Sequence, residues 1–122
     1  MTATILVADD DPDILGLVKL RLERDGYDVV TAACGMDALT LARDRRPALA
    51  VLDVSMPGMT GLEVTQKLRA DEATAAIPVI LLTARVQEAD VAAGLASGAD
   101  AYLKKPFSPQ DLRERVAALL AG

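Results

Sequence analysis

The chain has 122 residues, of which 52% are hydrophobic and 25% charged, and this composition is typical of one globular domain rather than of a disordered chain. It contains no His and a single Cys, so zinc sites of His and Cys, a histidine general base and a disulfide framework are excluded. The net charge of −5 argues against binding to nucleic acid or to an anionic membrane, and we expect neither among the partners. No apolar run could span a bilayer and the N-terminus has no signal-peptide pattern, so we expect a cytoplasmic protein.

Short apolar segments alternate with segments of helical periodicity along the whole chain. This alternation predicts βαβ units, and therefore an α/β fold with a five-stranded parallel sheet. The predicted strands are residues 4–8, 27–32, 48–52, 79–83 and 101–104. The first, third and fourth are continuously apolar, as is typical of central strands, whereas the second and fifth mix polar and apolar residues like edge strands.

A helical pattern follows each predicted strand. The first helix should begin at Pro12 with Asp11 as its N-cap, because aspartate is favoured at the cap and proline at the first helical position. The fifth should open at Ser108, in a sequence that resembles a capping box. The fourth has apolar residues at Val91 and Leu95, but it is rich in alanine and contains a glycine that costs about 1 kcal/mol relative to alanine.

Polar residues stand at the carboxyl ends of four predicted strands, which is where open parallel sheets form their binding sites. Asp9 and Asp10 follow the first strand, Asp53 the third, Thr83 ends the fourth, and Lys105 follows the fifth. If the first and third strands are neighbours, three carboxylates meet, and they repel one another unless a cation joins them. Oxygen ligands without His or Cys favour Mg²⁺.

Four motifs in this order resemble the receiver domain of two-component response regulators, in the CheY-like superfamily. They are ILVADDDP at residues 5–12, DVSMPGMTG at 53–61, Thr83-Ala84, and KPF at 105–107. The resemblance covers essentially the whole chain and implies a single receiver domain over residues 1–122, without an output domain. It also implies a doubly wound (βα)5 flavodoxin-like sandwich with strand order 2-1-3-4-5.

The resemblance assigns the acceptor and the metal ligands. Asp53 is the implied phosphoacceptor, whose carboxylate would attack the phosphohistidine of a sensor histidine kinase, or of a histidine phosphotransfer protein, to give an acyl phosphate. Asp9, Asp10, Asp53 and the backbone carbonyl of Ser55 are the implied ligands of Mg²⁺ or Mn²⁺. Both assignments come from the family and are expectations for this chain.

The resemblance implies further residues that would contact the phosphoryl group, and others that would change conformation when it is present. Lys105, the Thr83 hydroxyl and the Ala84 backbone N–H would contact phosphoryl oxygens, which makes catalysis a matter of positioning and electrostatics. The resemblance also implies a cis bond between Lys105 and Pro106, and an inward swing of Tyr102 as Thr83 reorients.

These assignments imply a switch rather than an enzyme, since the domain would catalyse only its own phosphorylation and dephosphorylation. Phosphorylation would alter the surface of the fourth helix, fifth strand and fifth helix toward a downstream effector or a missing output domain. We expect a monomer or a weak phosphorylation-dependent dimer. Val91 and Ala101 stand where winged-helix members of the family usually carry an Arg and an Asp, so we expect no charged dimer interface of that type.

Three alternatives remain at this point. An aspartate-nucleophile phosphohydrolase would want a second acid two residues after the nucleophile, where this chain has Ser55. A flavin or nucleotide module would want a glycine- or hydroxyl-rich loop after the first strand, where Asp9, Asp10 and Asp11 stand instead. A receiver used only for phosphorylation-independent docking would not need the intact set of polar residues.

Overall fold

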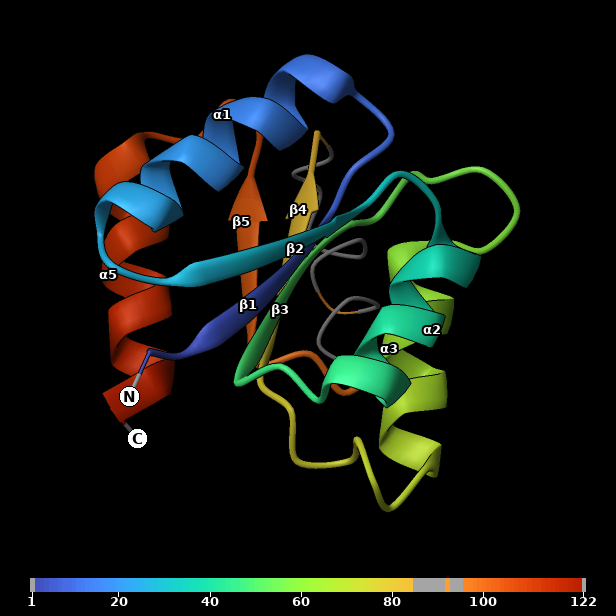
Figure 1. Cartoon of the computed structure of the whole chain (residues 1–122). Coiled ribbons are helices and arrows are strands. Elements are labelled where there is room, and N and C mark those ends of the chain that lie inside the picture. The colour runs from blue at the N-terminus through green and yellow to red at the C-terminus, as the bar shows by residue number, and fades with distance from the viewer. Residues whose placement is uncertain (1, 85–91, 93–95, 122) are drawn as a thin grey trace.

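The computed structural model describes residues 2–84, 92 and 96–121, and its centre is a parallel sheet of five strands. The strands lie in the order β2-β1-β3-β4-β5 and all point the same way (Figure 1). This confirms the predicted fold, and also the prediction that the second and fifth strands form the edges. The strands are β1 (Thr4–Ala8), β2 (Asp28–Ala32), β3 (Leu49–Asp53), β4 (Val79–Thr83) and β5 (Ala101–Lys104).

Helices cover both faces of this sheet. Figure 1 shows α1 and α5 on one face and α2 and α3 on the other. Their bounds are α1 (Pro12–Arg24), α2 (Gly35–Arg45), α3 (Gly61–Ala70) and α5 (Pro109–Ala121). The fourth predicted helix, with Val91 and Leu95, lies outside the described residues.

The helices begin where side chains can satisfy their first backbone N–H groups. The Asp11 carboxylate accepts hydrogen bonds from the N–H groups of Asp13 (2.9 Å) and Ile14 (3.5 Å), as predicted for the cap of α1. At α3, Thr60 and Glu63 form a reciprocal capping box. At α5, the Ser108 hydroxyl accepts from an N–H in the first turn at 3.0 Å. Each such cap typically stabilises its helix by about 1 kcal/mol.

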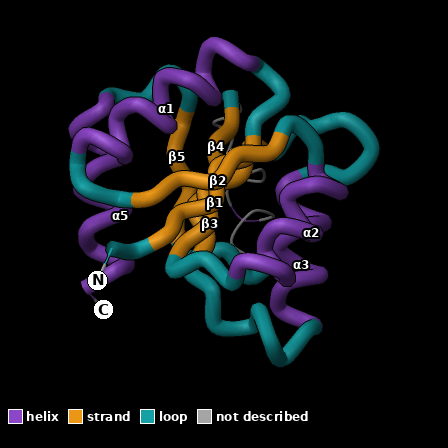
Figure 2. Tube along the Cα trace, viewed as in Figure 1, coloured by secondary structure: helices purple, strands orange, loops and turns teal. Residues whose placement is uncertain are grey.

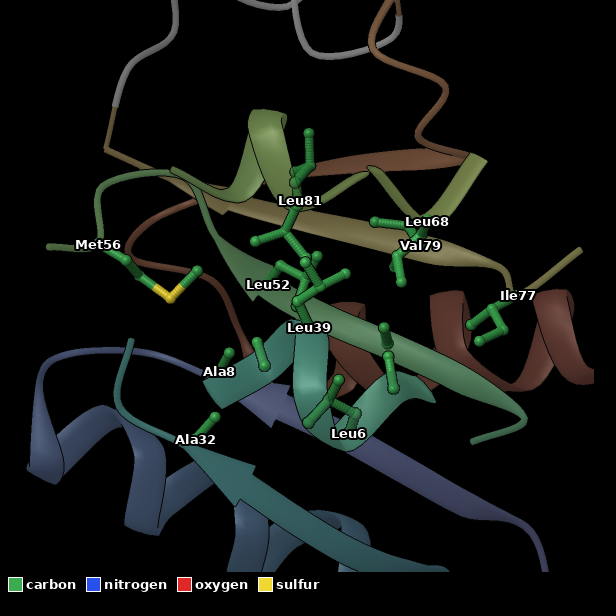
Figure 3. Close-up of a cluster of buried hydrophobic side chains, with 14 residues drawn as sticks. Leu6, Ala8, Ala32, Leu39, Leu52, Met56, Leu68, Ile77, Val79 and Leu81 are labelled. Carbon is green, nitrogen blue, oxygen red and sulfur yellow. The ribbon is translucent and has the colours of Figure 1, made fainter. Parts of the chain in front are cut away.

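The core has two halves because successive residues of a strand point to opposite faces of the sheet. In β1, Ile5 and Val7 pack in the half beneath α1 and α5, whereas Leu6 and Ala8 pack in the half beneath α2 and α3. Figure 3 shows this second half, where Met56 from the loop after β3 also inserts. Each large side chain buried in this way contributes about 1.5–3 kcal/mol.

The loops at the carboxyl ends of the strands lie on one edge of this core, and Figure 2 shows them as teal segments leading from the strands to the helices. Three predicted strand boundaries differ from those observed, and one of them is the start of the third strand, which lies at Leu49 rather than at residue 48. The second strand begins at Asp28 rather than at residue 27, and the third extends one residue further, because Asp53 still pairs with Leu82 of β4. Within the described ranges, no helix is long and apolar enough to cross a membrane.

Candidate functional site

Three carboxylates meet at the carboxyl ends of β1 and β3. Ala8 pairs with Leu52 in the sheet, so the next residues along the two strands, Asp9 and Asp53, lie side by side. Carboxylate oxygens of Asp9, Asp10 and Asp53 all lie within 4.8 Å of one another. Asp9 and Asp53 are buried and Asp10 is exposed, so the cluster has a buried floor and one side open to solvent.

Lys105 reaches this cluster from the residue after β5. Its Nζ donates a hydrogen bond to Asp9 Oδ2 at 2.9 Å and lies 3.2 Å from Asp53 Oδ1. The Lys105 backbone N–H donates to the carbonyl oxygen of Thr83 at 2.6 Å, and the Lys105–Pro106 peptide bond is cis, as the resemblance implied. Three carboxylates thus face one ammonium group, and the cluster keeps a net negative charge that can attract a further cation.

The surroundings shift the ionisation of both partners of this contact. Burial, supported by the nearby charge of Asp9, raises the pKa of Asp53 from 3.8 to about 6, although the charge and hydrogen bond of Lys105 act in the opposite direction. Burial alone would lower the pKa of Lys105, but the hydrogen bond to Asp9 and the charges of Asp53 and Asp9 outweigh it and raise the pKa. Lys105 therefore stays positively charged, while Asp53 is half ionised near pH 6 and mostly ionised only above it.

Short backbone contacts orient the two buried carboxylates. Asp9 Oδ1 accepts the N–H of Asp11 at 2.9 Å, which leaves Oδ2 for Lys105. Asp53 Oδ1 accepts the N–H of Ser55 at 3.4 Å. In both bonds, an aspartate carboxylate accepts from the backbone N–H two residues further along the chain, which is a local preference of aspartate. This preference is a sequence signal for the contact between the Asp11 N–H and the Asp9 carboxylate. From the sequence, Asp11 was predicted only to cap the first helix.

The remaining predicted residues lie at or just after the ends of β3 and β4, except Tyr102, which lies within β5 beside Leu81. Thr83 is 3% exposed at the end of β4, and Ala84 follows it. Tyr102 is half-buried in β5 and packs against the core half beneath α2 and α3. Ser55 is exposed, two residues after Asp53. The structure thus brings Asp9, Asp10, Asp53 and Lys105 into one cluster, whereas the switch roles of Thr83 and Tyr102 stay predictions.

The donor set fits a hard divalent cation. Every candidate ligand side chain in the cluster is a carboxylate, and the exposed Asp10 leaves a side open where water or a substrate oxygen can complete the coordination. Mg²⁺ typically binds through one or two protein carboxylates together with water and phosphate oxygens. A fully enclosed cage of side chains is therefore not required.

Comparisons with known proteins agree with this geometry. A family model described as "Response regulator receiver domain" matches residues 5–117. The alkaline phosphatase synthesis transcriptional regulatory protein PhoP of Bacillus subtilis is 45% identical over 98% of this chain and 49% of its own length. The DNA-binding dual master transcriptional regulator RpaA of Synechocystis is 48% identical over 95% of this chain and 48% of its own length. The chain thus spans about half the length of these relatives.

A solved structure bears on the metal. The receiver domain of the sensor histidine kinase PA1611 from Pseudomonas aeruginosa, with a magnesium ion coordinated in its active-site cleft, superposes with a TM-score of 0.92. It is 28% identical, and the match covers 100% of both chains. The magnesium ion is a property of that protein, and it shows that this fold can hold one.

One prediction about partners is wrong. The net charge of −5 led us to exclude nucleic acid, yet RpaA, which matches nearly all of this chain, is a DNA-binding regulator. The charge of a receiver half does not report the charge of the rest of a longer protein, because electrostatic attraction to DNA acts locally where basic side chains meet phosphates. An acidic receiver is thus compatible with DNA binding by the whole protein.

Proposed function

The chain belongs to the response regulator receiver domain family, and from this premise we propose that it is a phosphoacceptor switch in which Asp53 receives a phosphoryl group from a histidine kinase or a histidine phosphotransfer protein. The observation that carries the proposal is the arrangement of Asp53. Its buried carboxylate lies against both a second acid, Asp9, and the ammonium group of Lys105.

In the proposed reaction, an Asp53 oxygen attacks the phosphorus atom of phosphohistidine. A new O–P bond forms, the P–N bond breaks, and its electron pair stays on the imidazole nitrogen of the donor. The carboxylate must be ionised to attack, and the pKa of Asp53 near 6 leaves it largely ionised at neutral pH. Lys105 Nζ lies 3.2 Å from Asp53 Oδ1. A short movement would therefore bring it to an oxygen of the incoming phosphoryl group, whose negative charge it would neutralise.

Asp9, Asp10, Asp53 and the backbone carbonyl of Ser55 would hold Mg²⁺. When bound, the ion neutralises charge on the phosphoryl oxygens. Lys105 now neutralises part of the carboxylate charge, so its movement toward the phosphoryl group would leave Asp9 available to the ion. The acidic cluster and the magnesium-bound relative support this assignment.

Thr83 and Ala84 complete the proposed phosphoryl pocket. The Thr83 hydroxyl and the Ala84 N–H would donate to phosphoryl oxygens, and the small side chain of Ala84 leaves room for the group. Movement of Thr83 would then be transmitted to Tyr102 on the neighbouring strand β5, whose residue Lys104 pairs with Thr83. Phosphorylation would thereby alter the surface formed by β5 and α5.

The domain would act on itself and on no other substrate. An aspartate-nucleophile phosphohydrolase needs a second acid two residues after the nucleophile, and Ser55 cannot supply it. In a protein of the length of the relatives, we propose that the phosphorylation state of this domain controls a DNA-binding output region, because RpaA is named a DNA-binding regulator and PhoP a transcriptional regulatory protein.

Transfer of labelled phosphate from an autophosphorylated histidine kinase tests the proposal. We expect label on the wild-type chain in the presence of Mg²⁺, none on Asp53→Asn, and wild-type labelling of Asp44→Asn, which changes an exposed aspartate on α2. Equal labelling of Asp53→Asn would refute the assignment of the acceptor. Absence of label on every variant, with several kinases, would instead favour the docking module that needs no phosphorylation.

A further inference from the structure

The first residue of α3 lies directly against the backbone of the proposed phosphoacceptor. A Cβ atom placed on Gly61 would come closer than 3.0 Å to the carbonyl oxygen of Asp53. It would also lie 3.0 Å from the carbonyl carbon of Asp53 and 3.2 Å from the Cα of Val54. All three neighbours are backbone atoms, so no side chain can rotate away to make room.

Hydrogen bonds hold the same segment from both sides. The N–H of Gly61 donates to the carbonyl oxygen of Val54 at 3.0 Å, and the N–H of Val54 donates to Leu82 of β4 at 2.9 Å. The buried hydroxyl of Thr65 donates to the carbonyl oxygen of Gly61 at 2.7 Å. The backbone after Asp53 is therefore clamped between β4 and the first turn of α3.

The size of the disturbance caused by a side chain at position 61 follows from these distances. Ordinary contact between carbon atoms is about 3.5–4.0 Å, so a Cβ at 3.0 Å from the Asp53 carbonyl carbon requires a displacement of about 0.5–1 Å. The segment that must move carries the Asp53 carboxylate and leads directly to the Ser55 carbonyl. A misplacement of about 1 Å in a catalytic group can lower a rate about 100-fold.

We propose that Gly61 is a positioning residue for the phosphoacceptor. Its lack of a side chain allows α3 to hold Asp53 and the Ser55 carbonyl at the geometry that Mg²⁺ binding and phosphoryl transfer require. The inference rests on the proposed function, and it extends the role of Gly61 beyond the start of a helix, which is all that the sequence pattern indicates.

The chain offers a matched control at the start of α2. A Cβ on Gly35 would also come closer than 3.0 Å to its neighbours, but these are the carbonyl group and the Cβ of Met59, toward the far end of the same loop from Asp53. Gly35→Ala and Gly61→Ala therefore introduce the same methyl group at the start of a helix, each against a carbonyl group. Only in Gly61→Ala does the new methyl group press on the backbone of Asp53, the proposed phosphoacceptor.

The test measures Mg²⁺ binding by isothermal titration calorimetry and the rate of phosphorylation by acetyl phosphate at saturating Mg²⁺, well below the unfolding temperature of each variant. For Gly61→Ala we expect a rate about 100-fold below wild type and a Mg²⁺ affinity reduced by about tenfold. For Gly35→Ala we expect both quantities to stay within about twofold of wild type, even where its loss of stability is as large. Urea unfolding of both variants supplies that comparison.

Two results would overturn the inference: wild-type Mg²⁺ affinity and rate in Gly61→Ala, or equal losses in both glycine variants. If the wild-type chain accepts no phosphoryl group, the proposed function fails, and the difference in Mg²⁺ affinity between the two variants still decides the role of Gly61.

A gentler pair of variants serves if Gly61→Ala does not fold. Thr60→Ala removes the capping box of α3 and loosens its first turn, whereas Ser108→Ala removes the corresponding cap of α5. We expect Mg²⁺ affinity to fall at least twofold in Thr60→Ala and to remain unchanged in Ser108→Ala. Unchanged affinity in both would refute the role of the first turn of α3.

Discussion

Asp53→Asn should stabilise the fold, and the stabilisation should depend on pH. The substitution keeps the shape of the side chain and removes its charge. The pKa of Asp53 is about 6 in the folded state against an ordinary value of 3.8. This difference corresponds to about 3 kcal/mol, by which the buried, repelled carboxylate destabilises the folded state once it is ionised.

The sign follows from which state holds the proton. Below pH 3.8 the group is protonated in both the folded and the unfolded chain, so Asp53 contributes no penalty. Between 3.8 and about 6 the folded chain keeps the proton more tightly, and above that range both states are ionised and the full penalty applies. The free energy of unfolding of the wild type therefore falls through this range relative to that of Asp53→Asn.

The expected gain is about 1–3 kcal/mol at pH 8, because the penalty is already net of the attraction to Lys105, and the buried amide, which must itself be desolvated and hydrogen-bonded, recovers all or part of it. Urea unfolding followed by circular dichroism at pH 4 and pH 8, in the presence of EDTA, measures it. Asp44→Asn, on the exposed surface of α2, is the control and should change stability by no more than about 0.5 kcal/mol. A variant no more stable than wild type at pH 8, or a gain equally large at pH 4, would show that the charge of Asp53 does not destabilise the folded state.

Four further substitutions test other parts of the site and fold. Lys105→Met should retain or tighten Mg²⁺ binding in calorimetry, because it removes a competing positive charge, but should slow phosphorylation by about 100- to 1000-fold; wild-type rates would contradict its role. Asp10→Asn should weaken Mg²⁺ binding at least tenfold while leaving urea stability unchanged, since the side chain is exposed; unchanged affinity would remove Asp10 from the ligands. Thr83→Ala should still be phosphorylated, but the NMR shifts that phosphorylation causes in α5 should be lost; wild-type shifts would exclude Thr83 from the switch. Arg69→Ala should lower the free energy of unfolding by about 2–4 kcal/mol, because Arg69 donates to three carbonyl groups and to Asp100. A loss below about 1 kcal/mol in urea unfolding would show that water replaces these bonds.

Much of the fold could be predicted because each strand and helix carries its own signal. The continuous apolar runs of β1, β3 and β4 reflect burial on both faces, and Asp11 with Pro12 marks the start of α1. Strand order came from the family resemblance, since hydrophobic patterning does not say which strands are neighbours. The core role of Met56 and the bonds of Arg69 were not predictable, because both depend on segments that meet only in the folded chain.

For the site too, some features could be predicted from the sequence and others could not. Asp9, Asp10 and Asp53 could be expected to meet, because strand-end residues of neighbouring parallel strands lie at one edge of a sheet. The raised pKa of Asp53 could not be predicted, since it depends on burial and on where the Lys105 ammonium group lies. The close approach of Gly61 to the Asp53 backbone could not be predicted either, because a glycine at a helix start has the same pattern whether or not space is short.

The proposed switch depends above all on Asp53, which should accept a phosphoryl group in a reaction that requires Mg²⁺. Intact-mass spectrometry after incubation with acetyl phosphate, and separately with an autophosphorylated histidine kinase, tests this most directly on the wild type and on Asp53→Asn. We expect the wild type to gain the mass of one phosphoryl group with Mg²⁺ and none with EDTA, and Asp53→Asn to gain none. A gain in Asp53→Asn, a gain that persists in EDTA, or no gain from either donor would contradict this expectation.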